Sequence, residues 1–479
     1  MRLPGLCAAA LFLVAAPSQA QPGSAEQRIL ADMAVLTSDG MEGRRPGTSG
    51  ERKTVRELIA MFHRVGLEPG AGGGWRQPVP LAERRPVRAQ FAVRGGDDIS
   101  GDVLLIGERP AMRVSGAQVR YVDHAQAVAP APGMILLYRD QTPADAPFAP
   151  DSDNVARYER LAVSGAAMAL AIVDDRIIAR QRQRMPLGVI EAAGAARAPI
   201  RGYISEAAAQ RLLAGGVVVD ARVETAVRRF TSVNVIGRLR GATEPGRALV
   251  YSAHWDAFGR CRPGEADAIC NGGIDNASGI AGLLEIARWF VAGPRPDRSI
   301  LFVATTAEEH GLLGMRAYAA RPVVPLADTV AAINVDTIAL YGAGHPVGFV
   351  GGGLTDLDPI IARLVAGQGR TLDEGAGPAF VARSSDAWPM LRGGVPSVIL
   401  SNVIARTGPD KGAAFQNFIT TRAHFPSDDM RDLELGGAIE DLRLMHALGL
   451  DLARRDAWPD FLPGSRFSRP RSVRRTAGN

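Results

Sequence analysis

The chain has 479 residues, which is long for one compact domain and comfortable for two. A hydrophobic fraction of 46% and a charged fraction of 22% are ordinary for a globular protein and exclude disorder throughout. The net charge of +5 comes mostly from scattered arginines without an aromatic-interleaved basic run, so the composition argues against a nucleic-acid-binding protein.

The first 20 residues have the pattern of a secretory signal. Arg2 supplies the positive start, residues 6–16 form an apolar core, and residues 18–20 offer small side chains for cleavage. The apolar run is too short to span a bilayer as a stable helix, and we expect no membrane anchor elsewhere in the chain. We therefore predict an exported protein, either periplasmic or secreted.

Residues 21–95 are predicted to begin with two helices. Apolar residues recur at three- and four-residue spacings over 25–36 and 50–65. A glycine-rich stretch at 70–74 then breaks the pattern.

Residues 96–228 have a different texture and are predicted to form a small, β-rich separate module. Short apolar runs alternate with turns that contain Pro, Asp and Gly, and the runs lie at 103–106, 134–138 and 169–173. A helix is predicted over 157–165, before the third run.

From residue 233 onward, apolar strands alternate with helices. The predicted strands lie at 233–239, 249–253, 300–305, 330–335, 347–351 and 397–401. The predicted helices lie at 277–291, 309–320, 357–366 and 433–454. Near-continuous apolar strands imply a sheet that is covered on both faces. We therefore predict an α/β fold, a three-layer sandwich with a mostly parallel mixed sheet flanked by helices.

Two cysteines remain after removal of the signal. Cys261 and Cys270 lie on either side of a short loop. In an oxidising compartment such a pair often forms a disulfide. We favour the disulfide over the alternative of two free thiols.

Residues that can bind metal follow several of the predicted strands. Ligands of open α/β sheets bind at the carboxyl ends of the strands, so these side chains are expected to meet at one rim. They are His254 and Asp256 after the strand at 249–253, Asp275 before the next helix, Glu308 and Glu309 after 300–305, Asp336 after 330–335, and His424 near the end.

Two imidazoles and three carboxylates form a mixed ligand set that suits zinc. One carboxylate can bridge two ions, so five side chains can hold a metal pair about 3.5–4 Å apart. In Glu308-Glu309, one glutamate can bind metal while its neighbour takes a proton from the bound water. Asp256 lies two residues after His254, shares a face with it on an extended segment, and can orient the imidazole. Each residue alone also fits a structural role, such as a turn cap or a charge near a helix dipole.

The motifs in this order resemble those of peptidase family M28, the secreted zinc aminopeptidases with paired metals. The matching segments are H-x-D at 254–256, G-I-D-N-A-S-G at 273–279, T-A-E-E-x-G-L-L-G at 306–314, N-x-D at 334–336 and H-x-P-x-D at 424–428. The resemblance covers about 230–455, and also 28–80, where S-D-G-M-E-G-R at 38–44 and P-G-T at 46–48 match the family's opening segment.

This resemblance implies two zinc ions per chain. Asp275 would bridge them, His254 and Asp336 would complete one site, and Glu309 and His424 would complete the other.

The resemblance also implies the reaction, which is hydrolysis of the N-terminal peptide bond of peptides or proteins by a zinc-activated water. Glu308 would be the general base and Asp256 would orient His254. The implied fold is zinc-peptidase-like, or phosphorylase/hydrolase-like.

Residues 96–228 resemble a protease-associated domain inserted into this type of peptidase. The matching stretches are P-G-M-I-L-L-Y-R at 132–139 and 162–173, with G-A-A at 165–167. The predicted organisation combines the signal at 1–20 with a catalytic domain at 21–95 and 229–460, the insert at 96–228, and a basic, disordered tail at 461–479.

One segment departs from the family pattern. Ser385-Asp386-Ala387 resembles a family segment that has His after Asp, but that His is not one of the five ligands, so metal binding is expected to survive. Three alternatives stay open: a non-catalytic binding protein, a glutaminyl-cyclase-type enzyme with one zinc, and a carboxypeptidase that uses Arg383 or Arg406 to bind a carboxylate. The sequence leaves the oligomeric state open.

Overall fold

The structure is a computed structural model, and it describes residues 23–96, 98–123, 128–139, 161, 164–194, 199–373, 383–410 and 412–469. The predicted signal, the end of the predicted tail and most of the predicted helix at 157–165 lie outside these residues. Within them, no helix combines the length and the apolar character that crossing a membrane requires.

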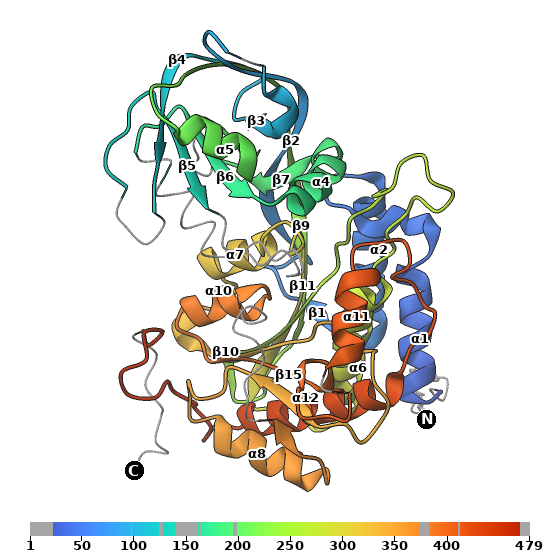
Figure 1. The fold of residues 1–479 in the computed structure, drawn as a ribbon. Coiled ribbons are helices and arrows are strands. Elements are labelled where there is room, and N and C mark those ends of the chain that lie inside the picture. The colour runs from blue at the N-terminus through green and yellow to red at the C-terminus, as the bar shows by residue number, and fades with distance from the viewer. Residues whose placement is uncertain are drawn as a thin grey trace, which may run out of the picture.

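The main lobe, in the lower half of Figure 1, is built on a mixed sheet. Its parallel centre consists of β15 (Ser397–Ser401), β12 (Thr329–Asn334), β10 (Glu244–His254) and β11 (Arg298–Thr305), in that spatial order. The end of β9 (Val218–Leu239) pairs antiparallel with β11 on one side. On the other side β13 (Val347–Val350) pairs antiparallel with β15 and parallel with β14 (Leu372–Asp373).

Helices cover both faces of this sheet, because alternate residues of each strand point to opposite sides. Leu249 and Tyr251 of β10 face a core shared with α1 (Ala25–Leu36), α2 (Ser49–Val65), α6 (Ser278–Ala292), α8 (Asp358–Gly367) and α12 (Leu435–Leu452). Val250 faces a second core, which includes α7 (Leu313–Ala320) and α10 (Ala387–Arg392). The predicted three-layer α/β sandwich is confirmed.

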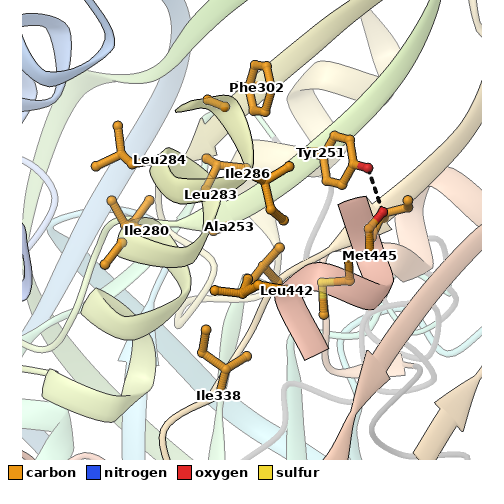
Figure 2. Packing of buried hydrophobic residues seen from close by; sticks show 14 of the residues in the cluster. Tyr251, Ala253, Ile280, Leu283, Leu284, Ile286, Phe302, Ile338, Leu442 and Met445 are labelled. Atoms are coloured by element: carbon orange, nitrogen blue, oxygen red, sulfur yellow. Dashed lines mark hydrogen bonds between the residues drawn. The ribbon is translucent and has the colours of Figure 1, made fainter. Parts of the chain in front are cut away.

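Figure 2 shows the first of these cores, in which side chains of the sheet meet α6 and α12. Tyr251 stacks on Phe302 of β11, with ring centroids 5.7 Å apart. The Tyr251 hydroxyl donates a hydrogen bond of 2.8 Å to the carbonyl of Met445 in α12. A buried hydroxyl that lacked this partner would destabilise the fold by about 1–3 kcal/mol, so the bond fixes α12 on the sheet.

Two long strands lead from the main lobe to a second lobe, at the top of Figure 1. β2 (Arg76–Val93) pairs antiparallel with β9 from Arg76 opposite Val235 to Val93 opposite Val219. The start of β9 also pairs with β4 (Ala111–Tyr121). From β4 the sheet continues, in spatial order, through β5 (Ile135–Arg139), β6 (Met168–Val173), β8 (Ile200–Ser205) and β3 (Val103–Gly107). β7 (Val189–Ala192) pairs with β2.

The second lobe has its own apolar cores. Side chains such as Phe91, Leu137 and Leu170 cluster apart from the core of the main lobe. The helices α4 (Asp175–Arg184) and α5 (Glu206–Leu213) belong to this lobe. β9 runs without a break through the predicted domain boundary between residues 228 and 229, so a continuous strand joins the two lobes at this point.

The predicted strands of the main lobe all coincide with observed strands, except that residues 335 and 351 lie one position beyond β12 and β13, but one helix begins four residues later than predicted. The sequence predicts a helix from residue 309, whereas α7 begins at Leu313. Ala307, Gly311 and Leu312 have positive φ values of 50°, 109° and 59°, which a right-handed helix cannot accommodate. Glu308 and Glu309 therefore lie in a turn between β11 and α7.

Candidate metal centre

Three adjacent parallel strands end at one rim of the main sheet. His254 is the last residue of β10, and it is in register with Thr305, the last residue of β11. Ser252 of β10 is in register with Asn334, the last residue of β12. Glu308 and Asp336 follow two of these strand ends within three residues, which brings them to the imidazole of His254.

Asp275 reaches the same rim from the short irregular turn η4 (Gly273–Ala277) ahead of α6. The carboxylate of Asp428 holds this turn, because it accepts the N–H groups of Ile274 at 2.8 Å and Asp275 at 3.1 Å. The approach is close, since a Cβ on Gly273 would lie 2.5 Å from the carbonyl oxygen of Asp429. Asp428 therefore ties the turn that carries Asp275 to the loop that carries His424.

His254 faces three carboxylates through one ring nitrogen. Its Nε2 atom lies 3.1 Å from Oδ1 of Asp275, 3.7 Å from Oδ1 of Asp336 and 3.9 Å from Oε2 of Glu308. The side chain of His254 is 2% exposed. An imidazole buried among three carboxylates is an environment that suits a divalent cation.

His424 approaches from the loop between α11 (Ala413–Thr421) and α12, with a positive φ of 66°. Its Nε2 atom lies 3.0 Å from Oε2 of Glu309 and 3.5 Å from Oδ2 of Asp275. The two oxygens of Asp275 thus face different histidines. All five predicted ligands come together, and the ligand atoms of His254, Asp275 and Glu309 lie within 4.8 Å of one another.

Glu308 also joins this arrangement. Its ligand atom lies within 4.8 Å of those of His254 and Asp336, so position alone makes it a possible ligand as well as a possible base. The Asp256 carboxylate accepts the backbone N–H of Glu308 at 3.0 Å.

Asp256 contacts His254 in two ways. Nδ1 of His254 lies 3.2 Å from the main-chain carbonyl oxygen of Asp256 and 3.8 Å from its carboxylate. The carbonyl is therefore the nearer acceptor for the second ring nitrogen of His254, and the carboxylate holds Glu308.

Buried carboxylates outnumber cationic groups in this cluster. Burial, reinforced by Asp336 and Glu309, holds the pKa of Glu308 well above its usual range. Burial raises the pKa of Asp256 to about 7. Burial alone would lower the pKa of His424, but Glu309 and Asp275 raise it to about 9.

The residues fit bound zinc. Among the described residues, Oε1 of Glu309 has no hydrogen-bond partner although it is buried. A buried carboxylate oxygen without a partner is costly unless a cation binds it. The nitrogen and oxygen donors are those that zinc accepts.

Sequence reasoning missed an arginine from the other lobe. Nη2 of Arg184, the last residue of α4, lies 3.4 Å from Nδ1 of His424. Its guanidinium lies 5.4 Å from the ring centroid of Phe258, which lies 4.4 Å from the His424 ring. Phe258 also contacts His310 edge-on at 5.8 Å, and burial lowers the pKa of His310 well below its usual value. Arg184 falls in the predicted separate module, 240 residues from its contact, and no local pattern marks it.

The predicted departure from the family pattern lies behind the rim. Ala387 begins α10 and is buried. Its neighbour Asp386 accepts a hydrogen bond from the hydroxyl of Thr305, and burial raises the pKa of Asp386 to about 6. Of the two arginines considered for a carboxypeptidase, Arg383 is half-buried and Arg406 is exposed.

The predicted disulfide between Cys261 and Cys270 is confirmed, with Cα atoms 5.7 Å apart. The disulfide loop lies beside the opening segment, because the N–H of Gly259 donates a hydrogen bond to the carbonyl of Gly43. The N–H of Cys270 in turn donates to the carbonyl of Gly259. It leads directly into the turn that carries Asp275.

Known proteins resemble this chain in sequence and in fold. The model of "Peptidase family M28" matches residues 234–448. Aminopeptidase NAALADL1 of Mus musculus is 37% identical over 129 residues, 25% of this chain and 16% of that protein. Probable glutamate carboxypeptidase AMP1 of Arabidopsis thaliana is 29% identical over 209 residues, 40% of this chain and 27% of that protein.

Among solved structures, the aminopeptidase from Aneurinibacillus sp. strain AM-1 aligns over 90% of this chain and 94% of its own, with a TM-score of 0.58 and 18% identity. The zinc aminopeptidase of Bacillus subtilis aligns over 94% of this chain and 100% of its own, with a TM-score of 0.51 and 18% identity. These likenesses show the fold. The chain spans about a quarter or less of the length of the two curated relatives.

Proposed function

We propose that this chain is a zinc exopeptidase of peptidase family M28, whose model matches residues 234–448, and that it removes residues from the free amino end of peptides. The observation that carries the proposal is the position of Asp275, whose two oxygens face two different histidines in an acid-rich, buried cluster.

Five side chains would hold two zinc ions. Asp275 would lie between them, and the remaining ligands would be His254 and Asp336 for one ion and Glu309 and His424 for the other. Bound zinc supplies Lewis acidity, which polarises the scissile carbonyl and lowers the pKa of a water nucleophile.

Glu308 would move the proton. Its raised pKa, a result of burial, suits a carboxylate that accepts a proton from the attacking water and passes it to the leaving amine. The bond from its N–H to Asp256 fixes its backbone, which positions the carboxylate. General acid–base catalysis of this kind contributes about 10²–10⁴-fold in rate.

The assignment of domains is part of the proposal. Residues 96–228 would be a protease-associated insert that narrows access to the metals, and the contact of Arg184 with His424 supports this role. The disulfide supports export, because such bonds persist in oxidising compartments.

Metal analysis and a peptide panel test the proposal together. We expect two zinc ions per chain, release of residues from peptides with a free amino end, and no turnover of the same peptides after N-acetylation. Treatment with a chelator should abolish the activity. Turnover of acetylated peptides at the same rate would rule out the amino-terminal specificity.

The cation Arg184 favours a second candidate, a carboxypeptidase-type enzyme that binds a substrate carboxylate. Peptides blocked at either end separate the two readings. Loss of turnover on C-terminal amidation, with acetylated peptides still cleaved, would favour the carboxypeptidase.

A further inference from the structure

The opening segment of the main lobe contains a fully buried arginine, whose side chain binds segments next to the metal cluster. Arg44 ends the short helical turn η1 (Asp39–Arg44), and it is 1% exposed. Glu42, Gly43 and Arg44 all have positive φ values, of 54°, 64° and 52°. Two non-glycine residues in the left-handed region are strained, so the surrounding contacts must hold this turn in place.

The guanidinium of Arg44 binds four main-chain carbonyl oxygens. Nε donates to Trp255 at 2.7 Å, and Nη1 donates to Leu36 at 2.8 Å and to Asn271 at 2.5 Å. Nη2 donates to Gly272 at 2.8 Å. One rigid side chain thus joins the end of β10 to the segment that precedes Asp275.

Three of these four carbonyls, those of Trp255, Asn271 and Gly272, belong to residues within four positions of His254 or Asp275. Trp255 stands between His254 and Asp256, and the carbonyl of Gly272 also accepts the N–H of Ala277, which closes the turn around Asp275. The arginine packs closely on this turn, because a Cβ on Gly272 would lie 2.5 Å from the carbonyl oxygen of Asp275 and 2.9 Å from Nη2 of Arg44.

Charge supports the same role. Burial lowers the pKa of Arg44 to about 10, and the nearby carboxylates oppose this shift, with the largest contributions from Asp428 and Asp256. Asp428 accepts the N–H group of Asp275, and Asp256 accepts the N–H group of Glu308. A buried cation beside them offsets part of the cost of burying these two carboxylates.

We propose that Arg44 is a positioning residue of the metal centre, which sets zinc affinity by fixing the segments that carry His254 and Asp275. The inference rests on the proposed zinc site and deepens it. Residues that orient metal ligands typically change metal affinity by about 10- to 100-fold when they are replaced.

The neighbouring residue offers a matched control. Arg45 is also buried, but its guanidinium points to the second lobe, where it binds Glu83 at 3.1 Å and the carbonyls of Leu187 and Gly188 at 2.9 and 2.8 Å. Loss of either arginine removes a buried cation, and only the loss of Arg44 reaches the metal segments.

The experiment compares Arg44→Met, Arg44→Lys and Arg45→Met in the full mature chain. Zinc dissociation constants are measured by competition with a chromophoric chelator, and Tm is measured on the metal-free proteins. We expect Arg44→Met to weaken zinc binding by about 10- to 100-fold. Arg44→Lys, which keeps the charge without the planar fork, should give a smaller loss. Arg45→Met should lower Tm and leave zinc affinity unchanged.

Two outcomes would overturn the inference. One is an Arg44→Met protein with lowered Tm and the zinc affinity of the parent. The other outcome applies if Arg44→Met does not fold, and it is an Arg44→Lys protein with the zinc affinity of the parent. A parent that binds no zinc would instead overturn the proposed function, so the two failures are distinguishable.

Discussion

The two lobes each bury a cluster of charged side chains, and the clusters differ in balance. In the second lobe, Arg84 binds Glu191 at 2.9 Å and also binds Glu108, while Arg201 binds both glutamates. Two guanidinium groups there alternate with two carboxylates.

In the main lobe, two histidines face four carboxylates, Asp275, Glu308, Glu309 and Asp336. The main-lobe cluster is buried and the second-lobe cluster is mostly so, with Glu108 30% exposed, but only the second-lobe cluster supplies a fixed cation for each carboxylate within itself. Buried charges are tolerated when they are paired, so the acid-rich cluster requires protons or metal ions. Charge balance, more than burial, therefore distinguishes a structural ion network from a site for cations.

Removal of metal should have the largest effect, because it should abolish the function of the main-lobe cluster and leave the second-lobe cluster unchanged. We expect dialysis against a chelator to reduce peptidase activity to background, because the Lewis acid is lost. Stoichiometric zinc should restore it. Activity that persists in protein shown to be metal-free would contradict the proposed chemistry.

Replacement of the proposed base should have the next largest effect. Glu308→Gln should lower kcat by about 10²–10⁴-fold, because the amide cannot carry the proton. Both zinc ions should stay bound, as measured by metal analysis. Glu265→Gln, at an exposed position in the disulfide loop, is the control. Normal turnover by Glu308→Gln would show that another group is the base.

Breaking the balanced cluster should damage stability and leave the chemistry intact. Glu191→Gln leaves Arg84 and Arg201 with less negative charge in a buried site, and we expect a loss of about 3–5 kcal/mol in the unfolding free energy. Denaturant unfolding measures this, and zinc content of the folded variant should match the parent. A variant that lost zinc and kept its stability would reverse the roles of the two clusters.

The pH dependence of the metal-free protein sharpens the same comparison. Asp256 and Asp428 have folded pKa values of about 7, above those of an unfolded Asp, and His424 has a pKa of about 9, above that of an unfolded His. Above about pH 6.5, where the lowered pKa values of His310 and His446 no longer oppose these groups, the folded state therefore binds more protons than the unfolded state, up to about pH 9. Its Tm should fall as pH rises across this window, and zinc should reduce the slope. If the Tm of the metal-free protein instead rises from pH 6.5 to pH 9, the main-lobe cluster does not hold an excess of buried carboxylates.

The sequence predicts much of this arrangement because its signals are local. Residues after apolar strands, such as His254 and Asp336, meet wherever parallel strands share a rim, so strand ends predict this part of the cluster. The position of Asp275 follows from its place before a helix.

Contacts between distant segments leave no local pattern. Arg184 comes from the second lobe, and the side chain of Arg44 reaches 211 residues along the chain to Trp255. The late start of α7 depends on positive φ values at Ala307 and Leu312, residues that ordinarily favour helices.

The smallest predicted effect tests whether the second lobe takes part in recognition. Arg184 lies beside His424 at the edge of the acid-rich cluster, where its cation can bind a substrate carboxylate. We expect Arg184→Gln to raise KM for short peptides with a free carboxyl end by about tenfold, equivalent to one charged hydrogen bond of about 1.5 kcal/mol. C-terminally amidated peptides should show little change, because the bond is absent from both enzymes. Arg176→Gln, at an exposed position on the same helix, should leave both KM values unchanged. Equal losses for free and amidated peptides would instead indicate that Arg184 acts on His424, and the second lobe would then support the metal centre without reading the substrate.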